Sequence, residues 1–219
     1  MFSTGKMKKK VEELKKSGLI RKKEKILIAF SGGPDSVFLY NLLNFLKEEY
    51  SLEISLMYIN HNLREDVGND LKFVREFSEE NNVPLYIESV NVKEYATENK
   101  KSIELAAREL RYEAIERILK NINYDRIATG HNLDDNIETF IFRLVRGTSL
   151  KGLKGIPEER GNIIRPILQF EKNEILNYLQ ENRKSYIIDY TNNENDYTRN
   201  YIRNEIFPMF VNINPNFRN

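Results

Sequence analysis

The residues best suited to chemistry form a short glycine-containing segment directly after an apolar run at 26–30. Two adjacent glycines let a backbone approach an anion closely. Serine hydroxyls and free backbone N–H groups can then face that anion at the positive end of a following helix. The spacing is neither G-x-G-x-x-G nor a Walker loop, since no lysine follows the glycines. We therefore predict a phosphate-binding loop of another kind, an ordinary strand–turn–helix corner being the alternative. Its residues are Ser31, Gly32, Gly33, Pro34, Asp35 and Ser36.

A second polar cluster, at 130–139, holds His131 and three carboxylates at the expected start of a helix. Asp135 and Glu138 are three residues apart, so they lie on one helical face. Such a cluster can bind a cationic amine, or it can hold Mg²⁺, which usually takes one or two carboxylates plus phosphate oxygens. Helix capping is the alternative interpretation, because the helix dipole favours acidic residues in a first turn.

The two histidines of the chain, His61 and His131, both follow expected strands. His61 by itself is also typical of a turn or packing residue. Arg108 and Arg111 share a helical face with Glu104. This spacing fits either a surface Glu–Arg pair or an arginine that neutralises phosphate charge, and we favour the second role for Arg111.

Two basic stretches are candidate nucleic-acid contacts. Arg146, Lys151 and Lys154 lie in a glycine-containing segment that could touch a phosphate backbone, or could be a solvated loop. Residues 1–25 hold ten Lys and Arg against three Glu, a local charge of +7, so the remaining residues carry −6 of the net +1. Residues 1–25 are equally compatible with a nucleic-acid contact and with a helix whose charges are simply solvated.

The pattern of the chain alternates strands with helices, which argues for βαβ units and a parallel sheet covered on both faces. In such sheets ligands bind beyond the carboxyl ends of the strands, where 31–36, 60–64, the segment after Val90 and 130–135 would meet. The chemical motifs fall in three of these four loops. The expected strands are 25–30, 54–59, 84–90 and 125–129, and the expected helices are 36–47, 66–82, 102–119 and 133–145.

We divide the chain into a basic helix (1–24), a nucleotide-binding domain (25–150) and a loop and helical extension (151–219). The extension should contain an extended piece at 163–168, helices at 172–182 and 201–210, and a polar loop at 187–200. The last residues show no clear domain end, so we expect further C-terminal domains beyond this chain.

Composition removes several classes of function. The chain has no cysteine, which excludes disulfides, thiolate-bound metals and thiol nucleophiles. It also lacks a run of roughly 20 apolar residues and an apolar signal-peptide core. We expect a cytoplasmic protein with no membrane partner.

The loop at 31–36 resembles the PP-loop of the ATP pyrophosphatases, which cut ATP between its α and β phosphates. Over nearly the whole chain the sequence resembles tRNA(Ile)-lysidine synthetase, a family with that Rossmann-like fold. The later segments matter most, since generic PP-loop enzymes do not share them. The matching segments are 31–36, 61–64, 103–108, 111–112, 130–139, 146–148, 151–153, 165–168, 189–192, 197–200, 202–203 and 207–208.

The resemblance implies a ligase with two steps. The C2 carbonyl oxygen of the wobble cytidine in a CAU-anticodon isoleucine tRNA attacks the α-phosphate of ATP, releasing pyrophosphate. The ε-amine of L-lysine then attacks C2 and expels AMP, and the lysidine formed changes codon reading from AUG to AUA. The implied partners are ATP, Mg²⁺, lysine and tRNA. The sequence indicates no obligate protein partner and is compatible with a homodimer.

The resemblance also implies roles for single residues. Asp35, Arg111 and His131 would be catalytic, with Asp35 the carboxylate associated with the metal and Arg111 a contact of nucleotide phosphates. His61 and His131 would join the loop at 31–36 in the ATP site. Asp135 and Glu138 would recognise the substrate lysine.

Three other interpretations remain open. A PP-loop tRNA thiolase shares the expected fold and target, but those enzymes generally need cysteines. An amidotransferase-type synthetase would need a glutaminase partner and lacks the segments at 189–203. A sensor of the same architecture would bind ATP without releasing pyrophosphate, and would not need Asp135 or Glu138.

Overall fold

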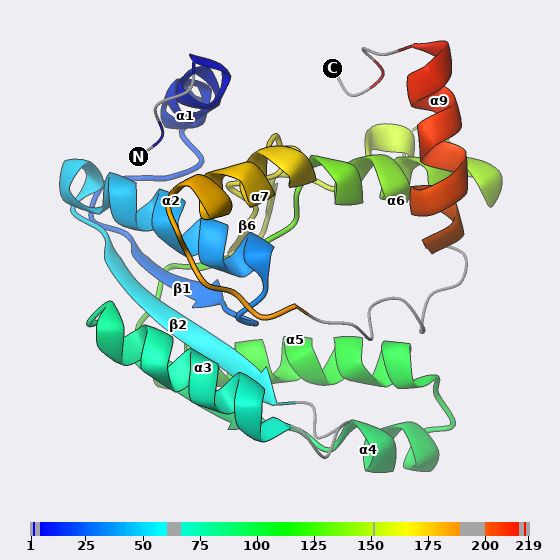
Figure 1. The fold of residues 1–219 in the computed structure, drawn as a ribbon. Helices are drawn as coiled ribbons and strands as arrows, with labels where there is room; N and C mark the ends of the chain where they lie inside the picture. The colour runs from blue at the N-terminus through cyan, green and yellow to red at the C-terminus, as the bar shows by residue number, and fades with distance from the viewer. Residues whose placement is uncertain are drawn as a thin grey trace.

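The computed structural model describes residues 2, 5–60, 67–150, 152–188, 200–214 and 217. These residues contain a six-stranded sheet in the order β3-β2-β1-β4-β6-β5, as Figure 1 shows in part. All neighbouring strands are parallel except the antiparallel pair β5–β6. The predicted α/β class with a parallel sheet is thus confirmed. The strands are β1 (Lys25–Ala29), β2 (Glu53–Asn60), β3 (Leu85–Ser89), β4 (Arg126–Ala128), β5 (Glu159–Arg160) and β6 (Ile163–Ile164).

The helices also follow the predicted order, with one addition. Helix α4 was not predicted, because its seven residues carry only two buried apolar side chains and its N-cap makes no side-chain hydrogen bond. The helices are α1 (Gly5–Ser17), α2 (Pro34–Tyr50), α3 (Val67–Glu80), α4 (Val92–Glu98), α5 (Ile103–Asn121), α6 (Leu133–Val145), α7 (Lys172–Glu181) and α9 (Phe207–Ile213), with short turns η1 (Gly152–Lys154) and η3 (Ile202–Ile206).

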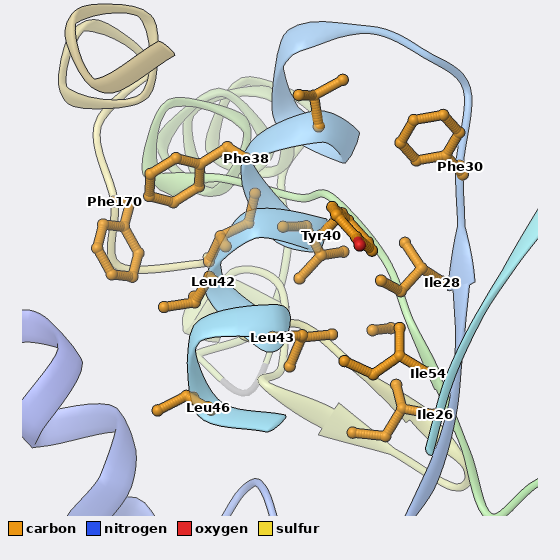
Figure 2. Packing of buried hydrophobic residues seen from close by; sticks show 14 of the residues in the cluster. Ile26, Ile28, Phe30, Phe38, Tyr40, Leu42, Leu43, Leu46, Ile54 and Phe170 are labelled. Atoms are coloured by element: carbon orange, nitrogen blue, oxygen red, sulfur yellow. The ribbon is translucent and has the colours of Figure 1, made fainter. Parts of the chain in front are cut away.

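The central strand β1 buries side chains on both faces of the sheet. Ile26 and Ile28 point to the layer that contains α2, where Tyr40 and Leu43 face them (Figure 2). Leu27 points the other way and packs with residues of α4 and α5. Successive side chains of a strand alternate between faces, so an almost continuous apolar run predicts a strand covered on both sides. The carboxyl ends of β1 and β4 are therefore held rigidly.

Helix α1 packs against α7 through both charge and apolar contacts. Lys6 Nζ lies 2.6 Å from Glu171 Oε1, and Lys10 Nζ lies 2.6 Å from Glu174 Oε2. The Phe2 ring stacks on Tyr178 with centroids 4.6 Å apart. These contacts pair two of the ten basic side chains of residues 1–25 with carboxylates of the same protein.

The predicted single helix at 201–210 is wrong in its geometry. The structure has a π-helical turn, η3, followed by the α-helical segment α9. Pro208 lies in the first turn of α9 and has no N–H to donate, so the preceding turn widens instead of continuing as a regular helix. Ile202 and Phe207 of this segment pack on Ile141 of α6. Among the described helices, none is long and apolar enough to cross a membrane.

Candidate active site

The loop after β1 has the geometry expected of a phosphate cradle. Gly32 has φ +80°, a backbone conformation that strains any other residue, and a Cβ placed there would lie 2.5 Å from Ile187 Cδ1, so the end of the Ile187 side chain would have to move. Gly33 is the N-cap of α2 and brings no side-chain cap, while Pro34 opens the helix. Ser36 Oγ donates to the Gly33 carbonyl at 2.8 Å and closes the turn. The N-terminus of α2 is thereby left for an anion.

Asp35 lies at the centre of this site. Its Oδ1 accepts a hydrogen bond from Asn132 Nδ2 at 3.0 Å, and its Oδ2 lies 2.6 Å from Lys172 Nζ. A Cβ on Gly130 would lie 3.3 Å from both the carbonyl carbon and the Cβ of Asp35. The glycine therefore lets the loop after β4 pack directly on the loop after β1. The structure brings the two predicted segments, 31–36 and 130–135, together.

His131 follows β4 and is mostly enclosed. Its Nδ1 lies 3.0 Å from Thr129 Oγ1. Burial, with further contributions from the positive charges of Arg165, Arg111 and Arg108, lowers the pKa of His131 to about 4. The imidazole is therefore neutral at physiological pH, and it can accept or donate one hydrogen bond beside a phosphate without adding charge.

Asp135 and Glu138 lie together on α6, and Asp135 also caps that helix. Asp135 Oδ2 accepts from the Asn132 backbone N–H and Asn132 Oδ1 accepts from the Asp135 N–H, both at 3.0 Å. The alternative interpretation of Asp135 as a helix-capping residue is therefore correct for this side chain. Asp135 Oδ1 lies 3.5 Å from Arg203 Nη2, while the buried Glu138 accepts from Arg203 Nε. Burial raises the pKa of Asp135 to about 6; the Asn132 N–H opposes this rise, whereas Asp35 and Glu138 add to it.

Arg111 lies on α5 beside Arg108 and Tyr112. The Arg108 guanidinium lies 5.8 Å from the centre of the Tyr112 ring. Loss of hydration lowers the pKa of Arg111; the Tyr112 side chain opposes this shift, and the Arg108 charge adds to it. The residue nevertheless lies at the exposed surface of α5. Both arginines influence the pKa of His131, so this part of α5 faces the loop after β4.

The residues predicted to contact tRNA lie beyond α6. The Arg146 guanidinium stacks on the Phe142 ring at 4.3 Å. Lys154 ends η1, and Arg143 Nη1 donates to the carbonyls of Gly152 and Gly155 at 3.0 and 2.8 Å. Their role remains a prediction. The predictions for His61, Lys151, 62–64, 189–192 and 197–199 lie outside the described residues.

Sequence reasoning missed two cations of the site. Lys172 opens α7, where the helix dipole disfavours a positive charge, and nothing nearby in the sequence marks it. Arg203 lies in the π-helical turn, where helical spacing fails as a guide. Arg203 falls within the matching segment 202–203, but no role was predicted for it. The carboxylate partners that reveal these roles are 137 residues away for Lys172 and 65 for Arg203.

The donor set suits a magnesium ion that arrives with a nucleotide. Within the part of the chain that the structure describes, no three His, Asp or Glu side chains gather around a common point. Asp35 offers one carboxylate at the phosphate loop, and Mg²⁺ commonly takes one or two protein carboxylates, with the remaining ligands from phosphates and water. A metal would have to share or replace the Lys172 and Asn132 contacts of Asp35.

Comparison with known proteins agrees with this geometry. A family model described as a PP-loop domain matches residues 3–210. The chain belongs to the PP-loop domain family. It is 42% identical to a tRNA(Ile)-lysidine synthase from Thermosipho africanus over 96% of this chain and 49% of that protein. It is 43% identical to one from Clostridioides difficile over 95% and 46%. The chain thus spans about half the length of these curated relatives, and the family resemblance found in the sequence is confirmed.

A solved structure shows the same fold at low identity. The U34-tRNA thiolase NcsA from Methanococcus maripaludis matches with a TM-score of 0.78 and 18% identity, over 97% of this PP-loop chain and 74% of that chain. That structure is named with its iron–sulfur cluster, which proteins usually hold through cysteine thiolates. The present chain has no cysteine, so the similarity extends to the fold and not to such a cluster.

Proposed function

We propose that this chain is the catalytic part of a tRNA(Ile)-lysidine synthetase, which adenylates the wobble cytidine and then joins lysine to it. The observation that carries the proposal is the position of Asn132. Its Nδ2 donates to Asp35 in the phosphate loop, while its Oδ1 accepts from the N–H of Asp135. One side chain therefore ties a phosphate site to a pair of carboxylates suited to an amine. The identity of 36–43% to several tRNA(Ile)-lysidine synthases supports the same assignment.

In the first step the enzyme holds ATP for attack at its α-phosphate. The cytidine C2 carbonyl oxygen forms the new P–O bond, and the bond between the α-phosphorus and the bridging oxygen breaks to release pyrophosphate. The N-terminal N–H groups of α2 and the Arg111 guanidinium stabilise the charge that moves onto the leaving group. Asp35 would help to hold Mg²⁺, which would neutralise phosphate charge when bound. The neutral His131 adds a hydrogen bond without raising the charge of the site.

In the second step the lysine ε-amine attacks C2 and AMP leaves. An amine attacks only when unprotonated, so the ammonium must first give up a proton. The buried Glu138 and Asp135 would together hold the amine, and Asp135 would then take the proton. A carboxylate with a pKa of about 6 is a better base near neutral pH than an ordinary aspartate. Both carboxylates already contact Arg203, so the incoming amine must share them with that guanidinium.

The decisive assay is incorporation of labelled lysine into bacterial tRNA by the protein that carries this chain, with ATP and Mg²⁺ present. The proposal requires about one AMP per lysine. The label must also survive mild alkali, which strips the ester formed by aminoacylation. ATP binding without AMP formation would instead support a sensor. Because tRNA is modified in the cytoplasm of bacteria, the proposal places the enzyme there.

A further inference from the structure

A cavity lies between α5 and the hairpin of β5 and β6. It has a volume of about 360 Å³ and is lined by Arg108, Tyr112, Arg160 and Ile163. Arg108 and Tyr112 are one turn apart on α5, and Arg160 and Ile163 face each other across the hairpin. None of residues 31–36 lines it. We call these four residues the arginine pocket. Arg165 is not one of its lining residues, but its charge interacts with those of Arg160 and Arg108.

Among the side chains that the structure describes, no carboxylate pairs with the guanidinium of Arg108, Arg160 or Arg165. The side chain of Glu104, one turn before Arg108, is not among those described. Arg160 and Arg108 both lower the pKa of Arg165, after the larger effect of burial, so the three charges act on one another. Like charges gathered without an anion raise the energy of the folded state. Such a cluster is typical of a site that an anion completes.

Arg165 supplies an independent sign of a missing ligand. Only 6% of this residue is exposed, and its Nη1 donates to the Pro157 carbonyl at 2.7 Å. Its buried Nε finds no hydrogen-bond partner among the described residues. An unpaired buried donor costs on the order of 1–3 kcal/mol, so native proteins seldom retain one without use. A ligand oxygen in contact with Arg165 would satisfy this donor.

The lining of the arginine pocket selects a phosphate attached to a planar group. Arginine forks match phosphate oxygens in pairs, and a tyrosine face can stack on a nucleobase. Tyr112 is 36% exposed and already has Arg108 against its ring. Of the two lining arginines, Arg108 also contributes to the lowered pKa of His131.

We propose that the arginine pocket binds a phosphodiester of the substrate RNA, with a base beside the reacting cytidine stacked on Tyr112. This inference rests on the proposed function, because it takes RNA as the substrate. Contacts to the phosphate fix the register of the strand, and stacking holds an unpaired base out of the helix. The pocket thus orients the anticodon loop so that only one nucleotide reaches the phosphate loop.

The test uses a fluorescently labelled RNA hairpin with a CAU loop, titrated with the full protein at several salt concentrations. Arg160→Ala should weaken hairpin binding about tenfold and reduce the slope of log affinity against log salt by about one. Arg117→Ala is the matched control, because it also removes one arginine charge. Arg117 lies on α5, outside the pocket, and 3.8 Å from the Glu88 carboxylate. ATP affinity should stay unchanged in both variants. Tyr112→Leu should weaken binding about tenfold, and Tyr112→Phe should restore it.

Three results would overturn the proposal. Equal losses in Arg160→Ala and Arg117→Ala would mean unspecific attraction of RNA. A loss of ATP affinity in Arg160→Ala would assign the pocket to ATP phosphates. If the unaltered protein did not bind the hairpin, RNA would be refuted as the occupant of the pocket. The lysine assay is separate: a protein that forms lysidine with no Arg160 effect refutes only the pocket, whereas Arg160-dependent RNA binding without lysine incorporation refutes only the proposed function.

Discussion

Replacing Lys172 with methionine tests how the phosphate loop exchanges one cation for another. The ammonium lies 2.6 Å from Asp35 Oδ2, and the other carboxylate oxygen is held by Asn132. A metal that binds Asp35 must therefore compete with Lys172. Methionine keeps most of the stem of the side chain and removes its charge, so the loop should stay folded while the competitor disappears.

The expected size of the change in Mg²⁺ requirement follows from the solvent exposure of the Lys172–Asp35 ion pair. The side chains of Lys172 and Asp35 are 36% and 26% exposed, so this ion pair is partly solvated and contributes on the order of 0.5–1 kcal/mol. Lys172→Met should thus lower the Mg²⁺ concentration needed for half-maximal ATP-analogue binding by about twofold to fivefold. Lost stability of the same size should reduce the Tm by about 1–4 °C.

The assay is fluorescence binding of a non-hydrolysable ATP analogue across a Mg²⁺ series. Lys10→Met is the control. Lys10 on α1 makes a 2.6 Å ion pair with Glu174 of α7, the helix that carries Lys172, but it does not contact Asp35. It should change the Tm but not the Mg²⁺ requirement. An unchanged or higher Mg²⁺ requirement in Lys172→Met would refute competition at Asp35, and the higher value would place Lys172 on the phosphates.

Three further predictions concern the loop and the carboxylates. Lysine affinity should fall up to tenfold per pH unit below about 6, because protonation removes the Asp135 charge; a flat KM for lysine between pH 5 and 8 would contradict this. Glu138→Gln should raise the KM for lysine far more than that for ATP, and equal changes in steady-state kinetics would argue for a purely structural role. Gly32→Ala should cost about 1–3 kcal/mol in urea unfolding, since it adds a clash with Ile187 to the strain of a positive φ. Gly161→Ala, with positive φ but open space, should cost about 1 kcal/mol.

Sequence reasoning succeeded where local chemistry and sheet geometry agree. The glycines at 32 and 33 require a close backbone approach, and the rule for parallel strands puts 130–135 beside them. The same reasoning separated Asp135 and Glu138 as a pair on one helical face. It left capping and amine binding as alternatives, and the structure shows that Asp135 does cap its helix.

The parts that sequence reasoning missed depend on distant contacts or short elements. The roles of Lys172 and Arg203 depend on ion pairs with carboxylates that are distant in sequence and that the fold brings close to them. The strands β5 and β6 have two residues each, too few for an alternating pattern, so the place of Arg160 beside α5 was not foreseen. Burial of Arg165 with an unpaired Nε is likewise a property of packing alone.

The distances along the chain between Asp35 and its partners have a consequence for synthesis on the ribosome. The carboxylate is made early, but Asn132 follows 97 residues later and Lys172 follows 137 residues later. Long-range contacts of this kind form slowly and only after the intervening segments are ordered. A nascent chain that has not yet produced α7 can pair β1, β2, β3 and β4 but has no Lys172 to balance Asp35. The phosphate loop is therefore among the last parts of the domain to reach its final geometry.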